Sequence, residues 1–142
     1  MNFFHLIKAS VLVNAITISS CSKNIEEPVV VEPAGSAKYL INNQTNKDIV
    51  VIYKKSEELG FEIDTTAVIK KHTSLKILED GIIGVNPAPK NSFSEIKFYE
   101  SHDLMNPLSV LSPVKNDDWT LLSQVLSSSG YGTTTYEIKL TN

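Results

Sequence analysis

The sequence predicts a mostly β protein, in which a single antiparallel β-sandwich of about seven to eight strands follows a signal peptide and a tether. Two observations support this. Short apolar segments show the alternation of side chains that is typical of half-buried strands. Clusters of Gly, Asn, Asp, Ser and Lys separate these segments at short intervals, as turns do in a sandwich.

The first 20 residues have the pattern of an export signal. Lys8 and the free amino group of Met1 precede an apolar run, residues 9–18, that only Asn14 interrupts. This run is about half of the roughly 20 residues that cross a bilayer as a helix, and the small residues Ser19 and Ser20 follow it, as at a cleavage zone. The alternative is a buried N-terminal helix of the domain.

The single cysteine of the chain lies directly after this segment. Ile18-Ser19-Ser20-Cys21 resembles the lipobox of bacterial lipoproteins. The resemblance implies cleavage before Cys21, a diacylglycerol on its thiol, an acyl chain such as palmitate on its amine, and attachment to the outer membrane through this lipid. With no second cysteine, the chain has no internal disulfide. The alternative is ordinary cleavage after Ser22, which would give a soluble exported protein.

Residues 21–36 are predicted to form the lipidated cysteine and a flexible acidic tether, flanked by prolines. Glu26-Glu27 partly resembles the surface-export signals of Bacteroidota lipoproteins, so the domain would face either the periplasm or the cell surface. Val29 to Val31 would alternatively pair with a sheet edge. Taken together, the signal, lipobox, tether and domain resemble small Bacteroidota-type lipoproteins.

The domain is predicted to span residues 37–142. Residues 49–53 (IVVIY) are apolar on both faces, as in a central strand, whereas residues 95–99 and 135–141 alternate between apolar and polar. Further strand candidates are residues 39–42, 67–70 and 75–79. Predicted turns are residues 42–48, 71–74, 80–81 and 127–132. The expected architecture is therefore a sandwich of the immunoglobulin or transthyretin kind.

Residues 117–127 (DDWTLLSQVLS) fit two structures. Trp119, Leu122, Val125 and Leu126 have helical spacing behind an aspartate cap. As a strand, the segment would place Trp119, Leu121 and Val125 on one face and form a hairpin with the last strand. The strand is favoured because every neighbouring segment is predicted to be β.

Several kinds of chemistry lack their usual motifs. The sequence has no glycine-rich phosphate loop, no zinc-protease helix motif and no serine-hydrolase elbow. All 13 cationic residues are lysines, and without Lys8 the remaining 12 face 16 acidic residues, a net charge of −4. Since phosphate recognition commonly uses arginine, we expect no nucleic-acid binding. We also expect no cofactor and no enzymatic activity.

A metal site would require residues that are far apart in the sequence. His72 lies in a predicted turn and His102 in a loop, and together with Asp117 and Asp118 they would form a mixed site only if folding brought them together. We expect these four residues to be solvated instead, with no bound metal. The Asp64-Thr65-Thr66 tripeptide also resembles the short O-glycosylation signal of Bacteroidota.

Two groups are candidates for a binding surface. The connection of residues 80–92 contains Ile82 and Ile83, and long loops on a rigid sandwich often carry function. Tyr99, Trp119 and Tyr131 would form an aromatic platform for sugar or protein. Both groups have a structural alternative, in which the loop covers the end of the core and the aromatic rings lie within it.

The expected function is therefore that of a non-enzymatic, membrane-anchored envelope lipoprotein that binds protein or glycan or serves an envelope assembly. One alternative is an immunity or inhibitor lipoprotein that neutralises an envelope-targeted toxin. The other is a metal-assisted hydrolase that uses His72, His102 and nearby aspartates.

Overall fold

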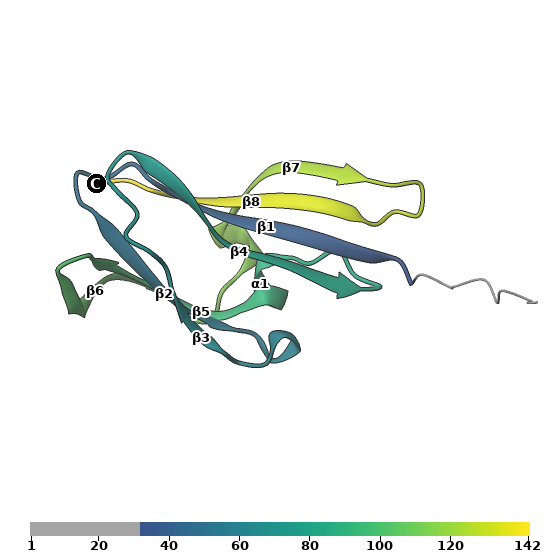
Figure 1. Ribbon diagram of the computed structural model, residues 1–142, viewed down its shortest axis with the longest axis horizontal. Helices are drawn as coiled ribbons and strands as arrows, with labels where there is room; N and C mark the ends of the chain where they lie inside the picture. Colours follow the sequence, from purple (N-terminus) through teal and green to yellow (C-terminus); the bar gives the residue numbers. More distant parts are fainter. Residues whose placement is uncertain (1–31) are drawn as a thin grey trace, which may run out of the picture. The chain divides into compact units, whose positions relative to one another are not determined.

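The computed structural model describes residues 32–142 and shows an eight-stranded β-sandwich made of two four-stranded sheets, which confirms the predicted fold class (Figure 1). The strands are β1 (Ala34–Asn43), β2 (Ile49–Lys55), β3 (Ile63–Thr65), β4 (Thr73–Ile83), β5 (Phe93–Glu100), β6 (Asp103–Leu111), β7 (Thr120–Leu126) and β8 (Gly132–Leu140). Three short helices connect them: η1 (Glu57–Leu59), α1 (Pro89–Ser92) and η2 (Asn116–Asp118). The signal, the lipobox, Cys21 and residues 22–31 lie outside the described residues.

The first sheet has the strand order β4-β1-β8-β7 and the second has the order β3-β2-β5-β6. All neighbouring strands are antiparallel except β1 and β8, which run parallel. The sandwich is therefore antiparallel as predicted, apart from this one central pair. β1 begins at Ala34, three residues before the predicted start of the domain at residue 37.

The strands bury alternate side chains between the two sheets. In β1 the buried positions include Ala37, Tyr39 and Ile41, because successive side chains of a strand point to opposite faces. In β2 both Val50 and Val51 are buried, which agrees with the prediction that this segment is apolar on both faces and central in a sheet.

Aromatic rings form the centre of the core. Phe93 stacks on Trp119 with ring centroids 5.6 Å apart, and it meets the Tyr39 ring edge-on at 4.9 Å. Tyr53 contacts Phe93 edge-on at 5.4 Å. These side chains come from β1, β2, β5 and the residue before β7, so they join the two sheets. Aromatic pairs in such geometries contribute about 0.5–1.5 kcal/mol each beyond their area burial.

The predicted strands differ from the observed ones in two places. Residues 67–70 contain only an isolated bridge between Ile49 and Ile69, and the short strand in this region is β3 instead. β6 was not predicted, because Asn106-Pro107 has the composition of a turn. Proline lacks an N–H to donate to a neighbouring strand, and β6 accommodates Pro107 because it lies at the edge of its sheet.

Residues 120–126 form the strand β7, which confirms the favoured structure over the helix, and the helical turn η2 precedes it. The pairing of β7 with β8 shifts register between Leu121 and Ser123, so Leu122 is a bulged residue. Leu121 lies opposite Tyr136 on the inward face, whereas Val125 lies opposite Thr133 on the outward face. The prediction that Trp119, Leu121 and Val125 share one face is therefore wrong for Val125, because the bulge reverses the alternation.

Candidate binding pocket

A pocket of about 290 Å³ lies at the end of the sandwich where the chain finishes. Its lining comes from four parts of the chain: the β1–β2 loop, β5, β6 and the residues at the end of β8. The lining residues are Thr45, Lys47, Phe98, Leu108, Ser109, Leu140, Thr141 and Asn142. Its apolar side chains are Phe98, Leu108 and Leu140. The volume is just below the range of about 300–1,000 Å³ that small-molecule sites occupy, so the pocket suits a small apolar group.

The pairing of the strands explains why this space is open. β7 begins at Thr120, which pairs with Glu137, so β8 continues to Leu140 without a neighbour on that side. On the other sheet, the pairing of β5 with β6 places Ser109 opposite Phe98 and Pro107 opposite Tyr99. Leu108 is therefore an extra residue in the ladder, a bulge of the kind that redirects a side chain at a sheet edge.

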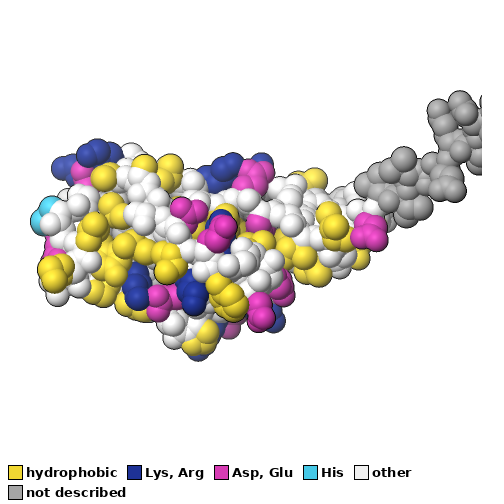
Figure 2. Space-filling view, turned by 60° about the horizontal axis from the view of Figure 1, so that its bottom comes forward, with side chains coloured by type: hydrophobic (Ala, Val, Ile, Leu, Met, Phe, Trp, Pro, Cys, Tyr) yellow, Lys and Arg dark blue, Asp and Glu magenta, His cyan; other side chains and the backbone are white. Residues whose placement is uncertain are grey.

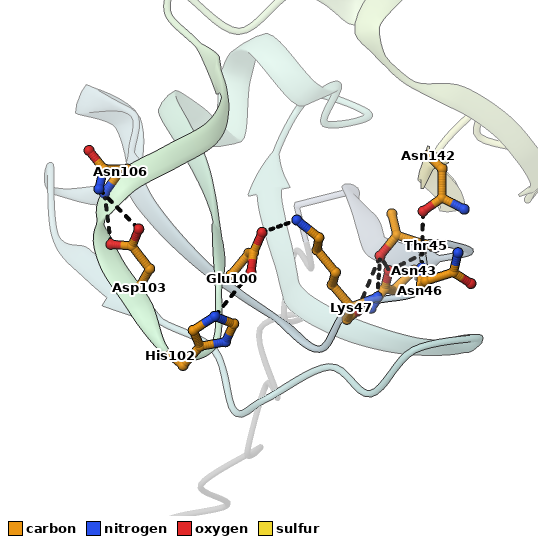
Figure 3. A network of polar contacts seen from close by, with 9 residues as sticks. All are labelled: Asn43, Thr45, Asn46, Lys47, Glu100, His102, Asp103, Asn106 and Asn142. Atoms are coloured by element: carbon orange, nitrogen blue, oxygen red, sulfur yellow. Dashed lines mark hydrogen bonds and ion pairs between the residues drawn. The ribbon is translucent and has the colours of Figure 1, made fainter.

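Hydrogen bonds hold the loop at the rim of the pocket (Figure 3). The buried Asn43 side chain donates to the carbonyl oxygen of Lys47 at 2.8 Å, and its Oδ1 accepts from the Thr45 hydroxyl at 2.7 Å. The backbone N–H of Asn46 donates to Oδ1 of Asn142, which ties the loop to the end of the chain. Because these bonds fix the backbone, the rim is preorganised before any ligand arrives.

The rim is charged. Lys47 forms an ion pair with Glu100, and the second carboxylate oxygen of Glu100 lies 3.2 Å from Nε2 of His102 (Figure 3). Beyond His102, hydrogen bonds from the Asn106 side chain and from the Met105 backbone hold the pKa of Asp103 below its usual range. The charged residue of the pocket lining, Lys47, is thus paired with Glu100.

The strand beside the pocket exposes apolar side chains to solvent. β6 carries four of them, Leu104, Met105, Leu108 and Val110, and the Met105 side chain is 89% exposed. Figure 2 shows hydrophobic side chains among charged ones on one face of the domain, with a histidine at one end. Exposed apolar groups next to one another on a small domain mark an interaction surface more often than scattered ones do.

The predicted aromatic platform does not form. Trp119 is 7% exposed and belongs to the core cluster, so the structural alternative is correct for this ring, whereas Tyr99 is 8% exposed but lies outside that cluster. Tyr131 is half-buried in the β7–β8 turn, where its carbonyl oxygen accepts from the backbone N–H of Ser127.

The segment of residues 80–92 is more ordered than the predicted loop. β4 extends to Ile83 and α1 occupies the last four positions. Asn86 bonds the middle of the segment to residues 130–132, because its side chain donates to the carbonyl oxygen of Gly130 and accepts from the backbone N–H of Gly132. Ile82 is half-buried and Ile83 is 64% exposed. Both lie beside the start of β1, the opposite end of that strand from the pocket.

The candidate metal ligands are not brought together. Within residues 32–142 no three His, Cys, Asp or Glu side chains are placed to hold a metal ion. His72 is an exposed turn residue, His102 pairs with Glu100, and Asp118 accepts from the backbone N–H of Lys115. None of the helices in this part of the chain is long and apolar enough to cross a membrane.

Comparison with known proteins adds no assignment: no protein-family model and no curated protein matches this chain. The fold and the pocket define a small β-sandwich domain with an apolar site at one end. Sequence reasoning missed this site, since its lining residues lie between positions 45 and 142 and share no motif.

Proposed function

We propose that this chain is a lipoprotein of the bacterial outer membrane, anchored through Cys21, whose sandwich domain is a non-enzymatic binding module of the cell envelope. In this proposal the pocket receives an apolar side chain of a partner protein, and β6 supplies the surrounding contact. The observation that carries the proposal is the apolar pocket itself, which is lined by Leu108, one of the exposed apolar side chains of β6.

The position of the pocket is compatible with an anchored protein. The tether would join the domain at Ala34, and the pocket lies beyond Asn43, at the other end of β1. The ten residues of β1 span about 30 Å at roughly 3.3 Å per residue. The pocket and the residue at which the tether would join the domain are therefore at opposite ends of this strand.

A protein partner fits this surface better than a glycan. Trp119 and Tyr99, two of the three rings of the predicted sugar platform, are buried, whereas the pocket has an apolar floor and is lined by Lys47, which pairs with Glu100. An apolar centre with a polar rim is the usual anatomy of a protein interface. An immunity lipoprotein would be a special case of this function, with a toxin as the partner.

Site-specific photo-crosslinking in intact cells tests this proposal. A photoreactive residue replaces Leu108 in the pocket, and the control variant carries it at Phe61, which is equally exposed at 48% but lies between β2 and β3. We expect a discrete adduct with one envelope protein from position 108 only, and its loss when Leu140→Lys places a charge in the pocket. No adduct at position 108, or the same adducts from both positions, would contradict the proposal.

A further inference from the structure

The four strands at the sheet edges differ in their protection against pairing with another chain. An edge strand presents unpaired N–H and C=O groups, and proteins protect such edges with charges, proline, bulges or short strands. β3 has three residues with Asp64 in the middle, and β4 carries Lys76, Glu79 and Asp80. β6 contains Pro107 and two register shifts.

The fourth edge strand, β7, lacks most of these protective features. Its seven residues, TLLSQVL, include no charged residue, no proline and no glycine, and all seven are exposed. Its four apolar side chains, Leu121, Leu122, Val125 and Leu126, are between 46% and 72% exposed. Its single bulge lies near the start, so Ser123 to Leu126 remain in regular register with β8.

We propose that β7 is a homodimerisation edge, at which it pairs antiparallel with β7 of a second copy around a two-fold axis. The β4-β1-β8-β7 sheet of one copy would then join the same sheet of the second copy, and together they would form one continuous sheet. The proposal goes beyond the binding function above and does not depend on it.

The composition of β7 favours a second copy as the occupant. A two-fold axis places residues at equal distances from the centre opposite each other, so a charge close to the axis would meet the same charge on the partner. β7 has none. By contrast, the same symmetry applied to β4 would bring its own charged residues, Lys76, Glu79 and Asp80, into the new pairing.

The faces of the side chains require the axis to pass through a residue, and the proposed register takes Gln124, the middle residue of the segment from Leu122 to Leu126. With the two-fold axis perpendicular to the sheet, opposing residues must lie on the same face. Gln124 lies opposite Thr134 on the inward face, whereas Ser123 and Val125 lie on the outward face. Centring the axis on Gln124 satisfies this rule, because Gln124 then faces its own copy and Ser123 faces Val125 of the second copy. Leu122 and Leu126 become neighbours across the new pair.

Both copies can be anchored in one membrane under the proposed attachment. Antiparallel pairing places the two Ala34 residues toward opposite ends of the dimer. The tether between Cys21 and Ala34, residues 22–33, reaches at most about 40 Å at roughly 3.3 Å per residue. This length accommodates a dimer whose continuous sheet lies along the membrane.

Disulfide crosslinking of the full chain tests both the dimer and its register. Opposed residues of antiparallel strands have Cα atoms about 4.5–5.5 Å apart, within the range of about 4.4–6.8 Å that a disulfide needs. Gln124→Cys should therefore crosslink to its copy. Val125→Cys is the matched control, because it is exposed like Gln124 but offset by two residues from its copy, which places the Cα atoms about 8 Å apart.

On a non-reducing gel we expect at least about tenfold more dimer from Gln124→Cys than from Val125→Cys, after subtraction of the wild-type signal from Cys21. Equal crosslinking at the two positions would indicate random collision and overturn the proposal. Monomer in both variants would also overturn it, since β7 would then be free or paired with another segment or protein.

Charge substitution at the axis provides a second test that a folding defect does not imitate. Gln124→Lys alone and Gln124→Glu alone place like charges opposite each other and should give monomers by light scattering. An equimolar mixture of the two variants should restore the dimer, because each lysine then faces a glutamate. Failure of the mixture to dimerise, or dimers from either single variant, would contradict pairing centred on residue 124.

Discussion

Phe93→Ala is the substitution that most directly tests the aromatic core. The Phe93 side chain is 1% exposed and its ring contacts Tyr39, Tyr53 and Trp119. Replacing a buried phenylalanine with alanine costs about 3–5 kcal/mol, from lost burial and the remaining cavity. A domain of this size is stable by about 5–15 kcal/mol, so the substitution removes a large fraction of the free energy of unfolding.

Urea denaturation measures this loss. With a slope of about 1.5 kcal/mol per molar urea, a loss of about 4 kcal/mol lowers the midpoint by roughly 2.7 M. Trp119 is the only tryptophan in the chain, so its fluorescence reports unfolding without a label. The control is Phe61→Ala, at a side chain that is 48% exposed, with an expected loss of less than about 1 kcal/mol. Equal midpoints for the two variants would refute the assignment of Phe93 to the core.

Three further predictions concern polar groups in the interior. Tyr39→Phe removes the buried hydrogen bond between the Tyr39 and Ser92 hydroxyls, which lie 2.5 Å apart, and should destabilise the fold by about 1–3 kcal/mol in urea titrations; an unchanged midpoint would contradict it. Burial raises the pKa of Asp80, whose two carboxylate oxygens are shielded from solvent. The carboxyl group of Asp80 therefore stays protonated to higher pH in the folded state than in the unfolded state, so its ionisation lowers the stability of the fold. Asp80→Asn should raise the melting temperature at pH 7 and raise it less below about pH 4; a lower melting temperature at pH 7 would contradict this. Burial, together with the charge of Asp64, raises the pKa of Tyr53 to about 12, so stability should fall as the pH rises from about 10 to about 12. The difference between wild type and Tyr53→Phe in alkaline melting curves measures this effect, and parallel curves would argue against it.

The sequence was informative where local pattern and tertiary structure agree. Residues 49–53 are apolar on both faces, and β2 buries residues of both faces, Val50 and Val51, whereas the alternation in residues 135–141 reflects one buried face of β8. The segment around Trp119 was ambiguous, because apolar spacing alone fits both a helix and a strand with a bulge.

The candidate pocket depends on features that local pattern does not contain. Its lining combines Thr45, Phe98, Leu108 and Leu140, which meet only through the pairing of β1 with β8 and of β5 with β6. The bulge at Leu108 follows a proline that made this strand unrecognisable in the sequence. Strand order and register are set by long-range contacts, so the site becomes visible only after the sheets are assembled.

Metabolic labelling with alkyne-palmitate, on wild type and on Cys21→Ser, tests the central claim of a lipid-anchored module most directly. We expect wild type to take up the label and to fractionate with the outer membrane, whereas Cys21→Ser takes up none. A soluble, unlabelled wild type with its N-terminus at Lys23 would contradict the lipid anchor and indicate an exported domain without attachment.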